Sequence, residues 1–563
     1  MVFKSIVPSV EIPDVDLATF CIEGSKLNAE PSSLAYKDIS TNTSITYRQL
    51  RSLCQQIGSG LVNNLGVKPG DVAAIFASNN IYYAPAFLGV VSTGAVCTTV
   101  SSAFNHSELE YQLADSNATV LFVGAKQQRV VQEALDRGIL RIPTQRIVVL
   151  DGTPQNPKFL SLASLLCSMP YSRFQISDKC PAESTMAAIV YSSGTTGMPK
   201  GVMLSHRNFV AYALLGNSIF EFQKENLQAE QQTQEASSDE VLKRSIAILP
   251  FAHIYGLTSL ITNSVAGGMT QYIMSDFSID GFLQAIQDHR IQTAAVVPSI
   301  FSQMAKYDRI KYDLSSLKML GSGAAALPGG VHKNVKDRFP LNVGNGYGMS
   351  ETCSGVCLMG NYRFEPGSVG FIYPNIEAKI VDTQTGCELG TDQEGEFCVR
   401  GPTIMMGYLN RPEETRRVID NDGFLHTGDI AVITKTNHVF ITDRIKELIK
   451  YKGLQVAPAE IEGILMDHPG IADAAVIGIN DRRRNTEVPH ALIVPKNQHI
   501  ASNTKVADEL CRSVEQWITS RVADHKRLRG GVALVKTIPR NQSGKIMHRL
   551  LRTEHNAKYT SKI

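Results

Sequence analysis

Short apolar stretches recur along the first part of the chain and are separated by amphipathic ones. The apolar runs predict β-strands at 72–76, 118–123, 146–150, 186–191, 246–249, 293–297 and 318–320. Residues 47–65, 107–114 and 126–137, which lie between several of them, are typical of helices. Because strands alternate with helices, we predict an α/β fold with mostly parallel sheets that helices cover.

The pattern changes after Gly395. Strand-like runs at 396–400, 424–426, 431–434 and 438–442 follow one another closely, and Thr436-Asn437 marks a turn between the last two. This spacing is typical of hairpins. A new βα pattern begins after Asp443–Lys446. We therefore predict an N-terminal domain over 1–443 and a C-terminal domain over 444–563, with a hinge near 443–446.

Composition supports a soluble globular protein. The 563 residues are 43% hydrophobic and 19% charged, and 55 basic residues against 53 acidic ones give a net charge of +2. This balance gives no reason to expect a nucleic-acid or anionic membrane partner. The apolar stretch 83–100 contains Pro85, Gly89 and Gly94, so we expect buried core rather than a membrane span. The first residues hold no long apolar run, and no signal peptide is expected.

Two further features bear on compartment and exposure. Ten cysteines are thinly spread, and the pair Cys353 and Cys357 has no second pair or histidine partners, so we expect reduced, mostly buried thiols rather than a zinc site. The segment 224–243 is polar and rich in glutamine, which indicates an exposed loop or a frayed helix.

A phosphate-binding motif follows the strand at 186–191. The run Ser192-Ser193-Gly194-Thr195-Thr196-Gly197 is followed by Met198-Pro199-Lys200-Gly201. The glycines allow the backbone to approach phosphate closely, the hydroxyls donate hydrogen bonds, and Lys200 adds a positive charge. A Walker A loop needs glycine before the lysine and serine or threonine after it, and this run has neither. A flexible linker is the other reading, but it would not be expected directly after a buried strand.

The run SSGTTGMPKGV closely resembles the phosphate loop of the adenylate-forming superfamily, which includes acyl- and aryl-CoA ligases, luciferases and peptide-synthetase adenylation domains. The resemblance continues in order along nearly the whole chain and is strongest to 4-coumarate:CoA ligase-like enzymes. It implies a large N-terminal domain of stacked, mostly parallel sheets with a small β-barrel-like subdomain. It also implies a small, mobile C-terminal α+β domain.

Two motifs extend the nucleotide site that this resemblance implies. In Asn345–Glu351, the segment with Gly346 would bind nucleotide, Tyr347 would stack on adenine, and Ser350 would contact phosphate or the acyl group. Glu351 would bind Mg²⁺ together with Thr196, because carboxylate and hydroxyl oxygens suit this hard cation. In Phe424–Asp429, Asp429 would accept both ribose hydroxyls, and Arg444 would be a second ribose or phosphate contact.

The C-terminal motifs imply a moving lobe. Ile538–Ile546 resembles the loop that carries the catalytic lysine, here Lys545. In the segment 449–458, Lys450 and Gln455 match a face used during adenylation, and Lys452 and Gly453 match the CoA tunnel. Lys446 matches the hinge about which the small domain rotates between the two half-reactions.

The acid-binding residues are implied by a third group of motifs. Leu249–Leu257 resembles the segment of coumarate ligases whose histidine borders the acyl pocket, and the matching pocket positions are His253, Tyr255, Ser259, Gly323, Ala324 and Gly348. The run Gly321–Leu327 departs from the plant enzymes, because glycine replaces a lysine that would bind a ring hydroxyl and Ala326 replaces a proline. Aryl acids, arylacetic acids and medium-chain fatty acids therefore remain open.

Together these features predict a ligase that uses ATP, Mg²⁺ and coenzyme A, forms an acyl-adenylate, and passes the acyl group to the CoA thiol. A luciferase-like oxygenase, an adenylation enzyme that loads a carrier protein, and an inactive binding protein are the alternatives. The final residues Ser561-Lys562-Ile563 resemble the peroxisomal address Ser-Lys-Leu, which predicts an import-receptor partner and a peroxisomal location, with the cytoplasm as the other.

Overall fold

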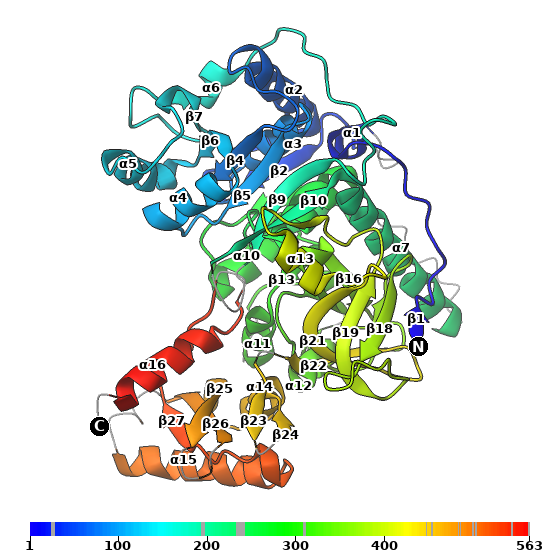
Figure 1. Ribbon diagram of the computed structural model, residues 1–563, viewed down its shortest axis with the longest axis vertical. Helices are drawn as coiled ribbons and strands as arrows, with labels where there is room; N and C mark the ends of the chain where they lie inside the picture. Colours follow the sequence, from blue (N-terminus) through cyan, green and yellow to red (C-terminus); the bar gives the residue numbers. More distant parts are fainter. Residues whose placement is uncertain are drawn as a thin grey trace.

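The computed structural model describes the chain except for residues 24–28, 193–197, 232–241, 308–310, 340, 446, 452–453, 482–483, 485, 498–499, 501–503, 542–543 and 561–563. Three sheets build the larger part of the molecule, which we call the large lobe (residues 1–445). Residues 447–560 form the small lobe, at the lower end of Figure 1. Each lobe has hydrophobic clusters of its own.

The first sheet has eight strands in the order β20-β10-β9-β5-β4-β6-β7-β8. All its pairs from β9 to β8 are parallel, and helices cover both faces (Figure 1). In β4, Ala73 and Ile75 pack with α2 and α3, whereas Ala74 and Phe76 pack with α4 and α5. Because both faces are buried, the central strands β4, β6 and β7 are almost entirely apolar. Their bounds are Gly407–Tyr408, Lys200–Ser205, Met186–Ser192, Val96–Val100, Val72–Phe76, Ala118–Val123, Ile147–Val149 and Leu160–Ser161, and the helices are Tyr47–Asn63, Tyr83–Val91, His106–Asp115 and Gln128–Asp136.

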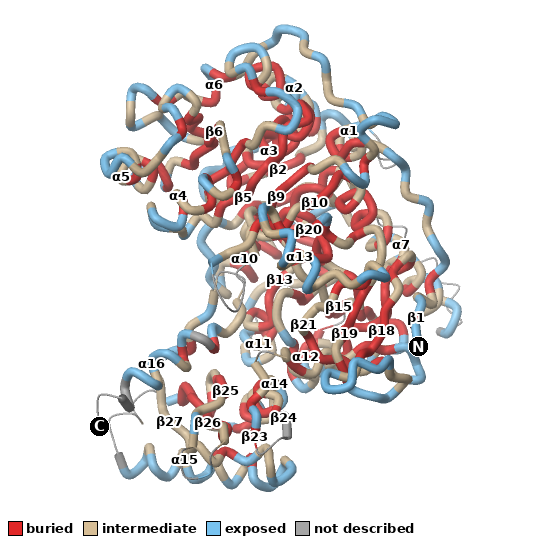
Figure 2. Tube along the Cα trace, viewed as in Figure 1, coloured by how far each residue is buried: buried red, intermediate tan, exposed pale blue. Residues whose placement is uncertain are grey.

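The second sheet has nine strands in the order β17-β16-β15-β14-β13-β11-β12-β2-β3, and the five pairs from β15 to β2 are parallel. Figure 2 shows that the residues between this second sheet and the first sheet are mostly buried. The long helix α7 (His206–Gln231) contacts strand β16 of this sheet, and so does the short helical segment α8 (Ile254–Gly256). The next segment, η3 (Leu257–Thr262), contacts both of these helices. The strands are Phe371–Ile372, Ser354–Met359, Asn342–Met349, Met319–Ser322, Thr293–Val296, Arg244–Ala247, Thr270–Ile273, Leu34–Asp38 and Ser44–Thr46.

A third sheet has five antiparallel strands in the order β1-β18-β19-β21-β22. It corresponds to the subdomain that we predicted to be β-barrel-like. Its strands are Val2–Lys4, Glu377–Val381, Glu394–Arg400, Leu425–Ile433 and Val439–Arg444. The last three contain the runs predicted as hairpins. The final strand ends at Arg444, directly before the small lobe.

The small lobe is an α+β unit. The strands β25 (Ile471–Asp481), β26 (Thr486–Pro495) and β27 (Val532–Leu534) form one sheet, and β23 (Ile449–Tyr451) pairs with β24 (Leu454–Val456). One face of the larger sheet packs on α14 (Pro458–Met466) and α15 (Thr504–Thr519), and the other packs on Leu551 of α16 (His548–Thr560).

The predicted fold class is confirmed: two large, mostly parallel sheets, an antiparallel subdomain and a small α+β unit are present. The stretch 83–100 is core, since every residue of α3 and β5 is buried. All ten cysteines are free, and six of them are buried. The predicted exposed segment 224–243 begins as helix, because α7 continues to Gln231. Within the described residues, no helix is long and apolar enough to cross a membrane.

Candidate active site

A single cavity of about 2000 Å³ lies where the three sheets of the large lobe meet the small lobe. Its polar end is lined by residues from several strand ends and from the small lobe, namely Ser192, Lys200, Gly346, Tyr347, Ser350, Glu351, Asp429, Arg444 and Lys545. These are the described residues predicted to bind nucleotide, metal or the reacting phosphate. The fold therefore brings together groups that lie more than 300 positions apart in sequence.

The hairpin β9–β10 presents the start and end of the phosphate motif. Ser192 ends β9 and pairs in register with Lys200 at the start of β10, so the two flank the turn between these strands. Residues Ser193, Gly194, Thr195, Thr196 and Gly197 lie outside the described residues. The Lys200 ammonium pairs with Glu414 and lies 4.9 Å from the centre of the Tyr408 ring. Tyr111 donates a hydrogen bond of 2.8 Å to the Pro199 carbonyl, which fixes the backbone beside this lysine.

Glu351 is a buried carboxylate at the centre of the polar end. It lies in the short 3₁₀ turn Ser350–Thr352 after β15 and is 5% exposed. Ser192 donates a hydrogen bond of 3.1 Å to its Oε1 atom, and Tyr408 donates one of 2.9 Å to the same atom. Among the described residues no group donates to Oε2. A carboxylate oxygen that faces a phosphate-binding loop, with hydroxyls beside it, fits the oxygen ligands that Mg²⁺ prefers.

Asp429 is held between an aromatic hydroxyl and a guanidinium. It is 2% exposed, Tyr347 donates a hydrogen bond of 2.7 Å to Oδ2, and the Nε of Arg444 lies 2.9 Å from Oδ1. The antiparallel pairing of β21 with β22 places Asp429 opposite Arg444 in register. This arrangement joins the predicted adenine and ribose contacts into one hydrogen-bonded group.

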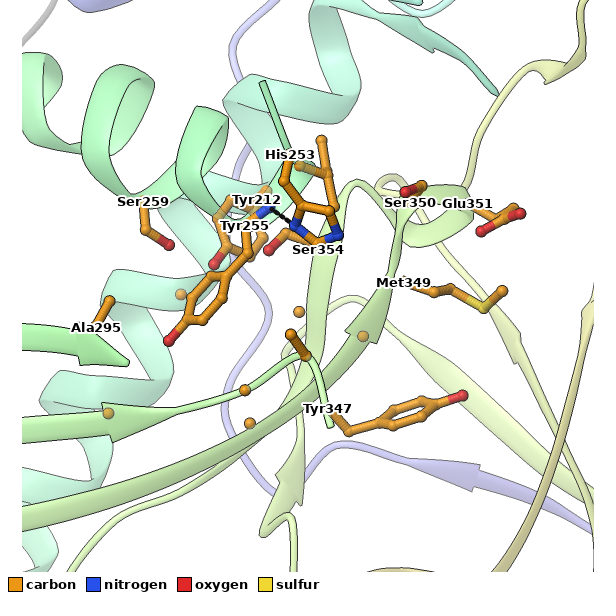
Figure 3. A pocket seen from close by; sticks show the side chains of 18 of the residues that line it. Tyr212, His253, Tyr255, Ser259, Ala295, Tyr347, Met349, Ser350, Glu351 and Ser354 are labelled. Atoms are coloured by element: carbon orange, nitrogen blue, oxygen red, sulfur yellow. Dashed lines mark hydrogen bonds between the residues drawn. The ribbon is translucent and has the colours of Figure 1, made fainter. Parts of the chain in front are cut away.

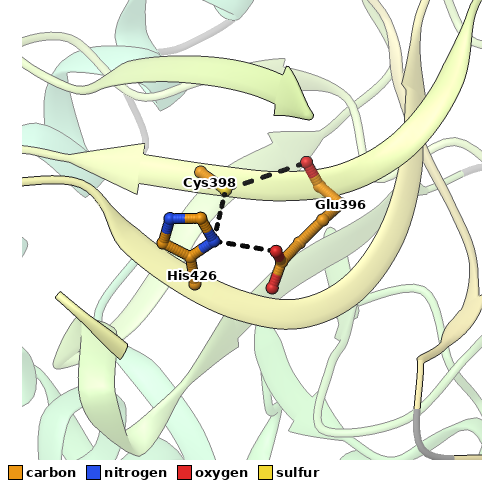
Figure 4. A group of neighbouring side chains, drawn as sticks. All are labelled: Glu396, Cys398 and His426. Atoms are coloured by element: carbon orange, nitrogen blue, oxygen red, sulfur yellow. Dashed lines mark hydrogen bonds and ion pairs between the residues drawn. The ribbon is translucent and has the colours of Figure 1, made fainter. Parts of the chain in front are cut away.

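The strand that carries Asp429 is anchored by a second polar group, shown in Figure 4. The Nδ1 atom of His426 lies 2.8 Å from Glu396 and 3.4 Å from the Cys398 sulfur. Glu396 also accepts a hydrogen bond of 3.1 Å from the Gly428 amide. The hydrogen bond and the negative charge of Glu396 raise the pKa of His426, which favours the imidazolium. The ion pair accounts for the closeness of these three groups and fixes the turn before Asp429.

Lys545 reaches the cavity from the small lobe. Its Nζ atom lies 3.8 Å from Glu447, and its side chain is 26% exposed. Glu447 is shared with His548, whose other ring nitrogen lies 2.7 Å from Glu462. Burial, followed by the positive charge of Arg444, lowers the pKa of Lys545 to about 8. Near neutral pH this lysine is therefore a cation beside the polar end of the cavity.

The apolar part of the cavity begins at His253 (Figure 3). Burial lowers the pKa of His253 to about 4, so the imidazole is neutral near pH 7. Its Nδ1 atom accepts a hydrogen bond of 3.3 Å from the Tyr255 amide, which leaves the proton on Nε2. Tyr255, Ser259, Gly323, Ala324 and Gly348, the other predicted pocket residues, all line the same cavity. Figure 3 shows Tyr255 extending across it toward the strands.

Other predicted residues are not brought to the cavity or cannot be placed. Lys450 is exposed on β23, opposite Gln455, and does not line the cavity in this arrangement of the lobes, because its side chain points to solvent. The Gln455 side chain, Lys446, Lys452, Gly453 and the terminal Ser561-Lys562-Ile563 lie outside the described residues. The roles of all these residues, the domain boundary at 443–446 and the peroxisomal address stay predictions.

Three contacts of the site were missed from the sequence. Tyr408 bonds to Glu351, Glu414 pairs with Lys200, and Glu447 lies beside Lys545. None belongs to a motif that we had singled out. The only signal was their chemistry, since a buried cation in a phosphate site needs a counter-charge before its ligand arrives.

Comparison with known proteins agrees with this geometry. The family model described as AMP-binding enzyme matches residues 25–409, and the model of the AMP-binding enzyme C-terminal domain matches residues 460–545. The first covers more than half of the chain. The chain belongs to the AMP-binding enzyme family. Of its relatives, 4-coumarate–CoA ligase 1 of Petroselinum crispum is 35% identical over 98% of this chain and 96% of its own length. Luciferin 4-monooxygenase of Photinus pyralis is 34% identical over 93% of this chain and 91% of its own length.

Two solved structures share this fold. The anthranilate CoA ligase AuaEII, in complex with anthranoyl-AMP, has a TM-score of 0.83 and 23% identity over 97% of this chain and 98% of its own. ATP-bound MatB from Rhodopseudomonas palustris has a TM-score of 0.81 and 24% identity over 97% of this chain and 100% of its own. These matches cover both lobes.

Proposed function

We propose that this AMP-binding enzyme is an ATP-dependent acid:CoA ligase, which forms an acyl-adenylate and then an acyl-CoA thioester. One observation carries the proposal. Cationic and hydroxyl groups from both lobes line the same cavity as a long apolar pocket, so a nucleotide and an apolar acid fit end to end. The relatives named as 4-coumarate–CoA ligases and the complex of a CoA ligase with an acyl-AMP support this choice.

In the first step, a carboxylate oxygen of the acid attacks the α-phosphorus of ATP, and the bond to the β-phosphate oxygen breaks to release pyrophosphate. Negative charge builds on phosphate oxygens, so fixed cations and oriented donors supply most of the help. Lys545 and Lys200 are the cations, and Ser192 is a hydroxyl donor. Asp429, Tyr347 and Arg444 orient the nucleoside.

In the second step, the CoA thiol attacks the acyl carbon, the proton leaves the sulfur, and AMP departs. The neutral His253 borders the point where the acid enters the apolar pocket and can hydrogen-bond through Nε2–H. Glu351 would hold Mg²⁺, which supplies charge neutralisation for the phosphates when it is bound. The acid is of the aryl type, such as a cinnamate or phenylacetate, or a medium-chain fatty acid.

A light-emitting oxygenase is the second candidate, because the luciferin 4-monooxygenase relative covers nearly the whole chain. Its specific test is light emission with luciferin, ATP, Mg²⁺ and oxygen. We favour the ligase because the pocket segment holds Ile254-Tyr255 after His253, which matches the coumarate ligase pattern.

The deciding experiment measures pyrophosphate and AMP release by the purified full chain with ATP, Mg²⁺ and a panel of acids, with and without CoA. We expect AMP release that depends on both the acid and CoA, together with a thioester product seen by mass spectrometry. Light with luciferin and no CoA-dependent AMP would favour the oxygenase. If no acid in the panel releases pyrophosphate, the ligase proposal is wrong.

A further inference from the structure

Two residues of the phosphate motif, Ser192 and Lys200, bring a hydroxyl and an ammonium to the polar end of the cavity. Ser192 follows Tyr191 at the end of β9, and Lys200 follows Pro199 at the start of β10. Ser192 and Lys200 are paired in register across the hairpin. The positions of Tyr191 and Pro199 therefore decide where the hydroxyl and the ammonium can lie.

An ion pair lies beside this hairpin but outside the cavity. Asp115 is the last residue of α4, and Arg411 directly precedes α13. The Nη1 and Nη2 atoms of Arg411 each donate a hydrogen bond of 3.1 Å to Oδ1 of Asp115, and Nη1 also donates to Oδ2 at 3.3 Å. A guanidinium that donates through two nitrogens fixes the orientation of the carboxylate as well as its position. Since neither residue lines the cavity, the pair can affect a ligand only through its neighbours.

The first link from the ion pair reaches the strand that carries Ser192. The Tyr191 hydroxyl donates a hydrogen bond of 2.7 Å to Oδ2 of Asp115. Burial and this hydrogen bond raise the pKa of Tyr191, so the phenol keeps the proton that it donates. Because a phenol ring is rigid, the Asp115 carboxylate holds the backbone directly before Ser192.

The second link reaches the residue before Lys200. Nη2 of Arg411 donates a hydrogen bond of 3.0 Å to the Tyr111 hydroxyl, which in turn donates one of 2.8 Å to the Pro199 carbonyl. A hydroxyl has one hydrogen to donate. Because Arg411 occupies a lone pair of the Tyr111 oxygen, it favours the orientation in which that hydrogen points to Pro199. The guanidinium thus acts on the backbone beside Lys200 without touching it.

The third link reaches the counter-ion of Lys200. Glu414 pairs with Lys200 through Oε2, and its Oε1 atom lies 3.8 Å from Nε of Arg411. The hydrogen bond and charge of Lys200, together with the charge of Arg411, lower the pKa of Glu414. Glu414 is therefore ionised near neutral pH, and Arg411 remains beside it as a second cation when Lys200 turns to a phosphate.

The nucleoside end of the cavity has separate supports. Asp429 is held by Tyr347 and Arg444, which lie on β15 and β22. Neither of these contacts includes Asp115 or Arg411. The three links therefore bear on the phosphate-binding groups and not on the ribose and adenine contacts. Displacing a positioned group by ~1 Å can lower a rate about a hundredfold, so such support affects the chemical step as well as binding.

We infer that Asp115 and Arg411 are a positioning pair for the adenylation step, because their links hold Ser192 and Lys200 in the geometry that a polyphosphate requires. The pair supports the phosphate site from the end of α4 and the start of α13, and it touches neither the nucleotide nor the acid. This inference rests on the proposed ligase function and deepens it, since it assigns to the same site two residues that no motif of the sequence indicated.

The test compares ATP with AMP, because the two ligands share the nucleoside and differ in the β- and γ-phosphates. Dissociation constants are measured by titration calorimetry on the full chain, with Mg²⁺ and without acid or CoA. In Arg411→Gln we expect the Kd of ATP to rise about tenfold and the Kd of AMP to stay within about twofold. At saturating ATP and acid, pyrophosphate release in single turnovers should fall roughly tenfold to a hundredfold. Thioester formation from a supplied acyl-adenylate should stay near the wild-type rate, because that step does not use the polyphosphate.

Further variants show whether the pair acts as a unit. Asp115→Asn should give the same separation of ATP from AMP, and the double variant Asp115→Asn/Arg411→Gln should be little worse than either single one, because coupled residues are not additive. Arg411→Lys keeps the charge but loses the two-nitrogen fork, so it should be less impaired than Arg411→Gln and still below the wild type. Arg416→Gln, which removes the same charge at an exposed position of α13, is the matched control and should keep the wild-type constants.

Two results would contradict the inference. If the Kd values of ATP and AMP rise alike in a folded variant, the pair serves only the fold. If neither Kd rises, the pair does not support the phosphate site. Thermal unfolding midpoints show whether each variant is folded.

If Arg411→Gln does not fold, Tyr111→Phe decides, since it removes only the hydroxyl that joins Arg411 to Pro199. It should weaken ATP binding about threefold without a change for AMP, and wild-type constants for both ligands would overturn the inference. If the wild type binds ATP but releases no AMP with any acid, the ligase proposal fails, while the binding constants still decide the role of the pair.

Discussion

Asp429, a buried carboxylate, forms an ion pair with the half-buried Arg444 and also fixes Tyr347. Burial of a carboxylate is costly unless partners hydrogen-bond to it, and here a guanidinium and a phenol do so for a residue that is 2% exposed. In the absence of nucleotide the same three groups are therefore already arranged. Such preorganisation reduces the cost of ordering the site when a ligand binds.

The first prediction concerns Asp429→Asn. The change removes the charge on which ribose hydroxyls and Arg444 converge, and a hydrogen bond to a charged group contributes about 1.5–3 kcal/mol. We expect the KM for ATP to rise roughly tenfold to a hundredfold. Initial-rate kinetics at saturating acid would measure it. Asp392→Asn, at a surface position with positive φ that asparagine tolerates, is the control and should leave this KM unchanged.

The second prediction concerns pH. Because the pKa of Lys545 is lowered to about 8, the cation needed for adenylation is present below that pH and is lost as the pH rises through it. The adenylation rate should therefore fall above about pH 8. Glu447 raises the pKa of Lys545, so Glu447→Gln should move this fall to lower pH. Pyrophosphate release in single turnovers from pH 6 to 10 would test both.

Glu413→Gln, at an exposed position of α13 (Pro412–Val418), is the control for the pH profile, since it removes the same charge from a side chain that pairs with Arg416 and not with Lys545. An adenylation rate that does not change between pH 7 and 9.5 would mean that the charge of Lys545 is not required.

At the residue scale, the sequence motifs were enough to predict the charged side chains of the site, because binding phosphate and ribose requires particular residue types at fixed spacings. They did not find Tyr408, Glu414 or Glu447, whose role is to complete hydrogen bonds and charge balance. Such partners come from strands and helices that meet only in the folded chain, so local sequence carries no sign of them.

The strand β15 serves two purposes along its length. Gly344 and Gly346 line the cavity, and the end of the strand turns into the segment with Glu351 through an irregular register beside β16. The shift lies between Tyr347 and Gly348, where the backbone of β16 comes very close. A β-carbon on Gly348 would stand 1.7 Å from the Ser354 carbonyl oxygen.

The third prediction follows from that contact. Gly348→Ala forces β15 and β16 apart and should destabilise the large lobe by about 1–3 kcal/mol, the usual cost of overpacking. Thermal unfolding followed by circular dichroism would measure it. Gly216→Ala on α7, whose β-carbon would lie 3.8 Å from the Tyr373 ring, makes an ordinary contact and is the control. An equal loss in both variants would contradict the crowding argument.

The elements were predictable where one physical requirement dominated. Runs such as 72–76 and 118–123 are almost entirely apolar because helices cover both faces of their sheet, so their identity as parallel strands followed from the pattern. The shape of the cavity was not predictable. Gly344 reads as an ordinary strand glycine, and only the parallel register that pairs it with Gly321 of β14 shows that the two lie side by side at the cavity.

At the scale of the whole molecule, the site exists only when the lobes are close. Lys545 comes from a lobe with its own hydrophobic clusters, and one described contact across the boundary is polar, from the Lys306 ammonium to the Ala472 carbonyl at 3.3 Å. Interfaces of this kind permit relative motion of domains. We expect the second half-reaction to use another arrangement, in which Lys545 has left the cavity.

The fourth prediction tests this two-state scheme. Lys545→Ala should lower adenylate formation by about a hundredfold to a thousandfold, the cost of removing one fixed electrostatic group. It should largely spare thioester formation from a supplied acyl-adenylate and CoA, because that step does not use the lysine. Separate assays of pyrophosphate release and acyl-CoA formation would measure the two steps. Lys536→Ala, at an exposed position of the same lobe, is the control.

Equal loss of both half-reactions in folded Lys545→Ala protein would contradict the scheme. Folding of the small lobe can be followed separately, because the only tryptophan of the chain, Trp517, packs there on α15 and donates to the Ile464 carbonyl at 3.1 Å. Its fluorescence reports on that lobe alone.

The pairing of Lys200 with Glu414 has a consequence for how nucleotides compete. With this ion pair closed, the part of the cavity beside Lys200 has little excess positive charge, so a monovalent anion gains little by binding there. A ligand must carry enough negative charge in one place to displace the glutamate. A triphosphate does this better than a monophosphate. The competition with Glu414 for Lys200 therefore favours binding of ATP over binding of the product AMP.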